Sequence, residues 1–210
     1  MPGKRGRPIE YNPVKAIDHA RDVFWTSGFT ATSLDALSEA TGMNRPSLFG
    51  AFGDKERLYL ATLQRYREDG VAAMQAALTG KRPLRVELSE MLANATTAYL
   101  HSARGCLLIG TASVEATQRP PVREMLAGSL QAFNEVIEKR LRQAVADGEI
   151  EDTSEPSALA ALISATMHSL AVRARAGDSR VALDQLSAAA MDMICGKPPN
   201  RGSKTARKAR

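Results

Sequence analysis

Apolar residues recur every three or four positions over most of this chain, which is the spacing of one face of an α-helix. The clearest stripe lies between the Pro-Pro pair at 120–121 and Gly148, where it comprises Leu126, Leu130, Phe133, Ile137, Leu141 and Val145. Aromatic residues make up only 5% of the chain and alanine is plentiful, a composition that favours helix over sheet. We therefore predict an all-α protein of about nine helices.

Capping residues, glycines and prolines place the ends of these helices. Asn12 and Pro13 have the residue types of an N-cap and a first helical position, and Gly28 is expected to end that helix. Asp54 caps a long helix that is expected to reach about Leu78. Further helices are predicted over residues 83–102, 106–117, 120–147, 156–176 and 181–194.

Residues 32–52 predict two short helices joined by a tight turn. Thr32 is the expected N-cap of the first, and Gly42 stands where that helix should stop. Asn44 is the expected cap of the second, and Pro46 falls in its first turn, where a missing N–H costs little. A short helix with a small, polar and basic outer face suits the major groove of DNA. The residues expected on that face are Asn44, Arg45, Ser47 and Phe49 or Gly50.

Helical hairpins also occur in proteins that do not bind DNA, but further residues narrow the interpretation. The hairpin and its flanks resemble the DNA-binding domain of the TetR family of transcriptional regulators, over about residues 13–60 and only weakly beyond. The matching residues are Phe24, Gly28, Phe29, Thr32, Leu37, Ala40, Gly42, Pro46, Ser47, Leu48, Phe49, Phe52, Asp54, Lys55 and Glu56. The resemblance implies a three-helix DNA-binding domain over residues 11–57 and a larger helical ligand-binding and dimerisation domain over residues 58–196.

The same resemblance implies a set of DNA contacts. Lys55 stands where the family places a phosphate-binding lysine. The family usually has tyrosine in place of Phe49, and that tyrosine commonly bonds a phosphate; Phe49 has no hydroxyl, although its ring can still pack against sugar. The expected DNA-binding residues of the folded domain are Thr32, Asn44, Arg45, Pro46, Ser47, Phe49 and Lys55.

The net charge of +5 is concentrated at the two ends of the chain. Residues 1–9 and 197–210 together carry nine basic residues and no acid, so residues 10–196 have a net charge of −4. We expect residues 1–10 to be a disordered basic arm and residues 197–210 a disordered basic tail. Lys4, Arg5 and Arg7 resemble minor-groove arms, although a solvated arm without defined contacts is the alternative. The tail either binds nucleic acid nonspecifically or only increases solubility.

The last two predicted helices have broad apolar faces and many alanines. In the TetR family the corresponding helices form a two-fold, four-helix dimer interface, and this pair resembles them. The alternative is that both faces are internal to one subunit. The expected interface residues are Leu159, Leu162, Ile163, Thr166, Leu183, Leu186, Ala190 and Met193.

The resemblance further implies a cavity for a small apolar or amphipathic effector within the larger domain. Cys106 is either a small buried residue or a reactive thiol whose pKa is lowered by Arg104 or by a helix N-terminus. The expected lining is Leu92, Thr96, Tyr99, Cys106, Leu108, Thr111, Phe133, Ile137, Met167, His168 and Leu170, many of which would serve equally well as plain core.

No catalytic motif is recognisable in the sequence, and we expect neither an enzyme nor a cofactor or metal site. No signal peptide and no membrane span are expected, which favours a cytoplasmic protein. The predicted function is that of a homodimeric repressor, released from a palindromic DNA operator by a small-molecule effector. The alternative is a sequence-nonspecific nucleic-acid-binding protein driven by the basic tails.

Overall fold

The computed structural model describes residues 12–151 and 155–196. Within these residues the chain forms nine α-helices, a 3-10 turn at His101–Ala103 and a π-helical turn at Leu108–Ala112. The α-helices are α1 (Pro13–Ala31), α2 (Leu34–Thr41), α3 (Arg45–Phe52), α4 (Lys55–Ala77), α5 (Leu84–Leu100), α6 (Ser113–Glu115), α7 (Pro120–Ala146), α8 (Pro156–Ala176) and α9 (Arg180–Cys195).

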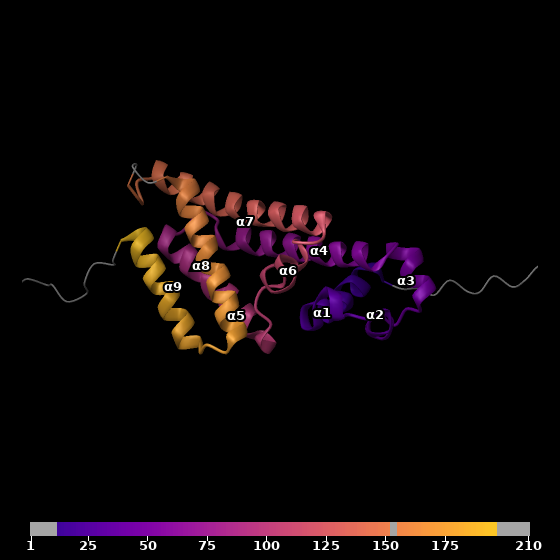
Figure 1. The fold of residues 1–210 in the computed structure, drawn as a ribbon. Coiled ribbons are helices and arrows are strands. Elements are labelled where there is room, and N and C mark those ends of the chain that lie inside the picture. The colour runs from indigo at the N-terminus through magenta and orange to yellow at the C-terminus, as the bar shows by residue number, and fades with distance from the viewer. Residues whose placement is uncertain (1–11, 152–154, 197–210) are drawn as a thin grey trace, which may run out of the picture.

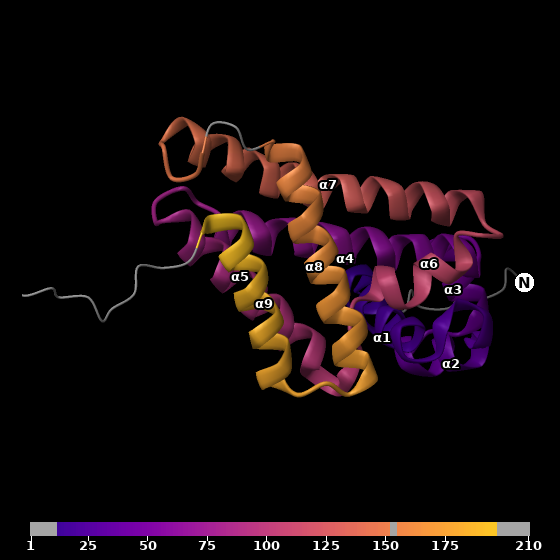
Figure 2. The same ribbon diagram turned by 60° about the vertical axis from the view of Figure 1, so that its left-hand side comes forward.

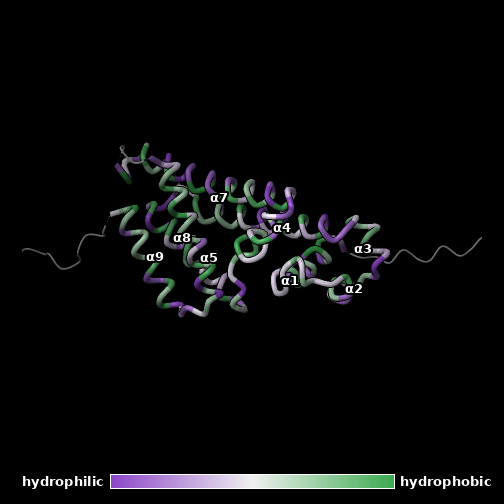
Figure 3. Tube along the Cα trace, in the orientation of Figure 1, coloured by the Kyte–Doolittle hydropathy of each residue, from purple (hydrophilic) through white to green (hydrophobic). Residues whose placement is uncertain are grey.

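The helices form a small group and a larger bundle that share α4 (Figure 1). Helices α1, α2 and α3 lie at one end of the molecule, and α4 runs from them into the bundle without a break. Figure 2 shows α8 crossing α7 and lying beside α9, and contacts between these helices and α5 close the bundle. Apolar and polar positions alternate along the helices (Figure 3), as expected for helices with one buried face.

The start of α1 follows the sequence prediction, and so does the break at Gly28, although a further short helical run follows it. The side chain of Asn12 accepts hydrogen bonds from the amides of Val14 and Lys15, and Pro13 is the first helical residue. Gly28 has a φ of +76° and a ψ of 169°, values that glycine tolerates and that are not helical, so the first helical run ends there at a kink. Helical structure resumes and continues to Ala31.

The predicted N-cap of α2 is wrong by one residue. Ser33, and not Thr32, caps the helix, because its hydroxyl oxygen accepts a hydrogen bond of 3.1 Å from the amide of Ala36. Thr32 is only 3% exposed, and its hydroxyl donates to the carbonyl of Gly28 at 2.6 Å. The Thr32 hydroxyl is therefore bonded to the residue four positions earlier, and the next residue is the cap.

The remainder of the hairpin agrees with the prediction. Gly42 ends α2 in the left-handed conformation, and the side chain of Asn44 caps α3 by accepting from the amide of Ser47 at 2.9 Å. Buried residues of α2, α3 and the turn between them pack against an aromatic cluster contributed by α1 and α4. This core comprises Leu37, Met43, Leu48, Phe24, Phe29 and Tyr59.

Helix α8 is, within the described residues, long and apolar enough to meet the criteria for a membrane span by length and composition. A core helix passes the same test, so this finding leaves the prediction of no membrane span as it stood. Its apolar character has a simpler origin in the fold, because α8 packs against α5, α7 and α9 and so contributes to the core.

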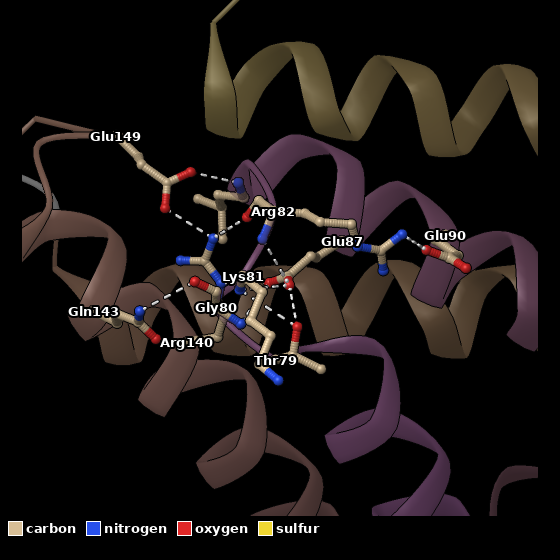
Figure 4. A network of polar contacts seen from close by, with 10 residues as sticks. Thr79, Gly80, Lys81, Arg82, Glu87, Glu90, Arg140, Gln143 and Glu149 are labelled. Carbon is tan, nitrogen blue, oxygen red and sulfur yellow. Dashed lines mark hydrogen bonds and ion pairs between the residues drawn. The ribbon is translucent and has the colours of Figure 1, made fainter.

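A buried ion network fastens the loop between α4 and α5 to α7 (Figure 4). The carboxylate of Glu87 accepts hydrogen bonds from the Thr79 hydroxyl at 2.7 Å and from the Arg140 Nε at 2.6 Å. The Nη2 atom of Arg140 also donates to Glu149 at 2.8 Å and to the carbonyl of Arg82 at 2.9 Å. Arg140 and Glu87 are 2% and 0% exposed. No sequence motif indicated this network, since it joins residues 79–87 to residues 140–149, which are more than fifty positions away.

Candidate functional site

The outward face of α3 carries most of the residues predicted to contact DNA. Asn44, Arg45, Pro46 and Phe49 are exposed, and Ser47 is half-buried. Phe49 is 43% exposed although it is a large apolar side chain. Apolar side chains in the major groove contact the methyl group of thymine, so an exposed phenylalanine is compatible with DNA recognition.

Thr32 is the exception among these predicted residues. It is buried and its hydroxyl is already bonded to Gly28. A side chain in this position does not reach the surface, so Thr32 supports the hairpin from inside and leaves the set of candidate DNA-contacting side chains.

Arg45 is held in place by an ion pair across the hairpin. Its Nε and Nη2 atoms lie 3.0 and 2.6 Å from one carboxylate oxygen of Asp35, on α2. The two side chains are 54% and 77% exposed, so the pair contributes little stability and is readily exchanged for another acceptor. The guanidinium is therefore positioned at the N-terminal end of α3, where recognition helices contact base edges.

Lys55 is the first residue of α4, and its ammonium lies 4.5 Å from the ring centre of Phe29. The guanidinium of Arg119, which precedes α7, lies 4.2 Å from the centre of the same ring. Burial, followed by the nearby charge of Arg119, lowers the pKa of Lys55. The lysine predicted to bind phosphate is thus adjacent to a residue of the larger bundle.

That adjacency is part of a polar joint between the two halves of the molecule. Arg119 forms ion pairs with Glu56 on α4 at 2.7 Å and with Glu115 on α6 at 3.1 Å. Glu115 also accepts a hydrogen bond of 2.9 Å from the Thr30 hydroxyl on α1. The joint, defined as Thr30, Glu56, Glu115 and Arg119, connects the α6–α7 corner to both helices that flank the hairpin.

A cavity of about 380 Å³ lies where α1, α4, α5, α7, α8 and the π-helical turn meet. Six of the eleven predicted lining residues border it, namely Tyr99, Cys106, Leu108, Phe133, Met167 and His168. The other five belong to the surrounding core, and their assignment to the cavity is wrong. They are Leu92, Thr96, Thr111, Ile137 and Leu170, all buried.

These five residues lie on the same helices as residues that line the cavity, but their side chains face other neighbours. The Thr111 hydroxyl is bonded to the hydroxyl of Tyr59 at 2.7 Å, away from the cavity. The Thr96 hydroxyl donates to the carbonyl of Leu92 on its own helix at 2.8 Å. A sequence stripe shows which residues of a helix are buried, but it does not show which of several neighbours they meet.

The sequence pattern missed the contribution of the N-terminal helices to the cavity. Arg21 and Trp25 of α1 line it, as do six residues of α4, among them Tyr66, Asp69 and Gly70. Gly70 could have indicated from the sequence that α4 packs closely at this point, since glycine in a helix interior is destabilising. A Cβ at this position would lie 3.0 Å from the ring of Phe133, so any larger residue would push against that ring where α4 packs on α7.

Trp25 is tied to the segment that leads into the π-helical turn. Its indole N–H donates to the carbonyl of Arg104 at 3.1 Å, and the Arg104 guanidinium lies 4.9 Å from the indole ring centre. Arg104 also forms an ion pair with Asp22 at 2.9 Å. The cavity wall that belongs to α1 is therefore fixed to the larger bundle by three polar contacts.

Cys106 is 5% exposed and borders the cavity. Burial raises the pKa of its thiol, although a hydrogen bond with Tyr66 and the amides of Ile109 and Leu108 partly oppose that effect. Arg104, which the sequence placed nearby as a possible activating charge, is paired with Asp22 instead. These contacts favour the small buried residue over the activated thiolate.

Alkylation with iodoacetamide at pH 7.5 tests this assignment. We expect Cys106 in the folded protein to react at least about tenfold more slowly than in urea, because burial and a raised pKa both reduce accessible thiolate. Mass spectrometry of the two cysteine peptides gives the rates, and half-buried Cys195 is the internal comparison. Faster reaction of Cys106 in the folded than in the unfolded protein would restore the reactive-thiol interpretation.

The outer faces of α8 and α9 carry a second apolar surface. Of the eight residues predicted at a dimer interface, Leu162 and Met193 are exposed, and four others are half-buried. Ile163 and Leu183 are 0% exposed and pack inside the subunit, so their assignment to the interface is wrong. Exposed apolar residues that the prediction omitted are Val172 and Val181, together with Ala158, Ala161 and Ala165.

Some of the predicted sites lie outside the described part of the chain. Lys4, Arg5 and Arg7 of the N-terminal arm and the basic residues of the C-terminal tail belong to this group. The minor-groove and tail hypotheses therefore stay predictions from the sequence.

Comparison with known proteins places these features in a family. Residues 16–62 match the model of the bacterial regulatory proteins of the tetR family, and residues 85–190 match the tetracyclin repressor-like C-terminal domain. The HTH-type transcriptional repressor ComR of Escherichia coli (strain K12) is 28% identical over 186 residues, which are 87% of this chain and 89% of ComR. The repressor BdcR of the same organism is 32% identical over 106 residues, half of this chain and 54% of BdcR.

Solved structures agree with these matches. A cysteine mutant of the TetR family transcriptional regulator CifR, in complex with 26-base-pair operator DNA, superimposes with a TM-score of 0.79. It is 28% identical, and the match covers 90% of this chain and all of the CifR chain. A regulatory protein TetR from Rhodobacter sphaeroides, 20% identical with a TM-score of 0.78, has the same fold. The chain belongs to the TetR family of helix-turn-helix transcriptional regulators, whose members act by binding DNA and are not enzymes.

Proposed function

We propose that this regulator is a homodimeric repressor that leaves a palindromic operator when a small molecule occupies the cavity. The observation that carries the proposal is the composition of the cavity wall. Two residues of α1 and six of α4 line the cavity, and these helices flank the hairpin that holds α3. A ligand that repositions either helix therefore acts directly on the recognition helix.

The DNA-binding part of the proposal rests on the exposed face of α3. Asn44, Arg45, Pro46 and Phe49 are exposed on it, and Lys55 stands at the N-terminus of α4, where backbone amides favour a phosphate. The repressor ComR and the operator-bound CifR are relatives of similar length, which supports the same mode of action here.

The dimer is supported by the apolar surface of α8 and α9. Met193 is 81% exposed, Val181 65% and Val172 55%, and exposed apolar side chains gathered on two neighbouring helices mark an interaction surface. The exposed alanines of α8 permit close helix approach, so a four-helix interface between two copies would bury this surface. Two-fold symmetry then gives two copies of α3 that fit successive major grooves about 34–36 Å apart.

Release would follow from a change in that separation. The joint of Thr30, Glu56, Glu115 and Arg119 links the α6–α7 corner to α1 and α4, so movement in the bundle is transmitted to the hairpin. The ligand lowers operator affinity only by as much as it prefers the non-binding arrangement. Such a regulator acts where operator DNA is, and we infer a cytoplasmic location.

Selection of binding sites from random duplex DNA tests the proposal against nonspecific, tail-driven binding. The full chain and a variant lacking residues 1–10 and 197–210 are compared in parallel. We expect both to enrich one palindromic site, with lower affinity for the truncated variant because phosphate contacts are lost. If neither enriches a site and binding disappears with the tails, the chain binds nucleic acid through its ends alone and the repressor proposal fails.

A further inference from the structure

We propose that the cavity accepts an uncharged, ring-containing molecule, and that Asp69 excludes anionic ligands by neutralising Arg21. This inference rests on the proposed function, because it takes the cavity to be the effector site. What it adds is the chemical class of the ligand, and binding of that ligand can be measured without DNA.

The wall of the cavity is suited to flat apolar rings. It contains four aromatic side chains, and Trp25 and Tyr66 meet edge to face with their ring centres 5.1 Å apart. Three methionines complete the apolar part, and their flexible thioethers adapt to ligands of different shape. Aromatic pairs contribute about 0.5–1.5 kcal/mol beyond area burial, so a ring is favoured over a chain of equal size. The other aromatic residues and the methionines are Tyr99, Phe133, Met74, Met91 and Met167.

The size of the cavity favours a compact ligand. Its 380 Å³ lies near the lower end of the range of about 300–1,000 Å³ that is typical of small-molecule sites. Asp69 and Ala73 on α4 and Asn94 and Ala98 on α5 are exposed lining residues, so the cavity opens to solvent between these helices. A compact molecule enters past Asp69.

Arg21 and Asp69 are the charged groups of this wall, and they compensate each other. The Arg21 Nη1 atom lies 3.1 Å from Asp18 and 3.6 Å from Asp69, and Asp69 is also 3.4 Å from the Nε of Arg65. The two guanidinium groups of Arg21 and Arg65 thus face the two carboxylates of Asp18 and Asp69. An anion would have to compete with two carboxylates for Arg21, and a cation would have to compete with two guanidinium groups for Asp69.

The other ionisable groups of the wall are held in their neutral forms. Burial raises the pKa of the Tyr66, Tyr99 and Cys106 side chains and lowers the pKa of His168. At neutral pH they offer hydrogen-bonding groups but no charge, which agrees with an uncharged ligand.

Two fluorescent probes with the same ring system separate the ligand classes. N-phenyl-1-naphthylamine is uncharged, and 8-anilino-1-naphthalenesulfonate adds one sulfonate to the same rings. We expect the uncharged probe to bind the full-length protein at least about tenfold more tightly, because the sulfonate meets Asp69 and finds no free cation. The variant Ala98→Phe, at the exposed edge of the cavity, should abolish binding, and Ala127→Phe on the exposed side of α7 should not.

The charge assignment has its own matched pair of variants. Asp69→Asn should raise the affinity for the sulfonate probe several-fold and leave the uncharged probe unchanged, since Arg21 loses a partner. Glu68→Gln, one residue earlier on α4 and outside the cavity, removes the same charge and should change neither affinity. Equal or tighter binding of the sulfonate to the wild-type cavity, or no binding of the uncharged probe, would overturn the inference.

Operator binding in the same samples keeps the two proposals apart. If the uncharged probe binds in the cavity without changing operator affinity, the ligand class stands and the release mechanism fails. If only the anionic probe binds and it releases the operator, the release mechanism stands and the ligand class is wrong.

Discussion

Replacing Arg45 with alanine is expected to weaken binding to the selected operator by about 1–3 kcal/mol for each subunit, and to relax selectivity at one base position. Arg45 is exposed at the start of α3, in the position from which a guanidinium contacts base edges. Its ion pair with Asp35 is exposed and therefore weak, so the guanidinium can transfer to a guanine at small cost. Fluorescence anisotropy with the operator and with a scrambled duplex measures the effect.

Two control variants define what this result means. Lys55→Ala should weaken binding to both duplexes alike and reduce the salt dependence, because a phosphate contact carries no sequence information. Asp35→Asn removes the partner of Arg45 without removing the guanidinium, so operator selectivity should survive. Unchanged operator selection by the Arg45→Ala variant would mean that α3 is not the recognition helix.

The second large effect concerns stability. Arg140→Met should lower the free energy of unfolding by about 3–5 kcal/mol, because it leaves the buried Glu87 carboxylate without its cationic partner. Methionine keeps most of the side-chain volume, so the loss reflects charge and hydrogen bonding more than a cavity. Arg142→Met on the same helix is the matched control. Its pair with Glu138 is exposed, and its removal should cost less than about 1 kcal/mol.

Urea unfolding at several pH values gives an independent check on the same network. Burial alone would raise the pKa of Glu87, but hydrogen bonds from Arg140, Thr79 and Gly80 outweigh it and lower the pKa from 4.5 to about 2. A carboxyl group whose pKa is lower in the folded than in the unfolded state stabilises the fold at pH values above its unfolded-state pKa. This contribution is lost as the pH falls from about 4.5 to about 2. The Arg140→Met variant should lack this part of the pH dependence. Equal pH profiles would show that the Glu87–Arg140 pair is energetically unimportant.

Local features of the fold were predictable because they depend on neighbours in sequence. Caps at Asn12, Asn44 and Asp54 satisfy amides two or three residues away, so their side chains could be assigned from residue type and position alone. The cap at Thr32 failed although the contact that decided it is also local. The Thr32 hydroxyl bonds the carbonyl of Gly28, four residues earlier, and residue type alone did not separate this bond from a cap of the following helix.

The dimer surface and the cavity show the same limit at a larger scale. Periodicity identified α8 and α9 as apolar helices, but it did not separate the inward Ile163 and Leu183 from the outward Val172 and Val181. An apolar residue on such a helix has two possible neighbours, the core and another subunit. The choice between them depends on how the helices cross, which is set by packing over the whole bundle.

The sequence by itself determined the helical class, the hairpin, the residues on the outer face of α3 and the family to which the chain belongs. These follow from periodicity, caps and a local motif, which act over a few residues. Only the tertiary structure decided that Arg21 and Trp25 of α1 form part of the cavity wall, and that Arg119 joins the bundle to Phe29 and Glu56. Such contacts join residues that are far apart in sequence, as Phe29 and Arg119 are, and they exist only after packing has fixed the distances between helices.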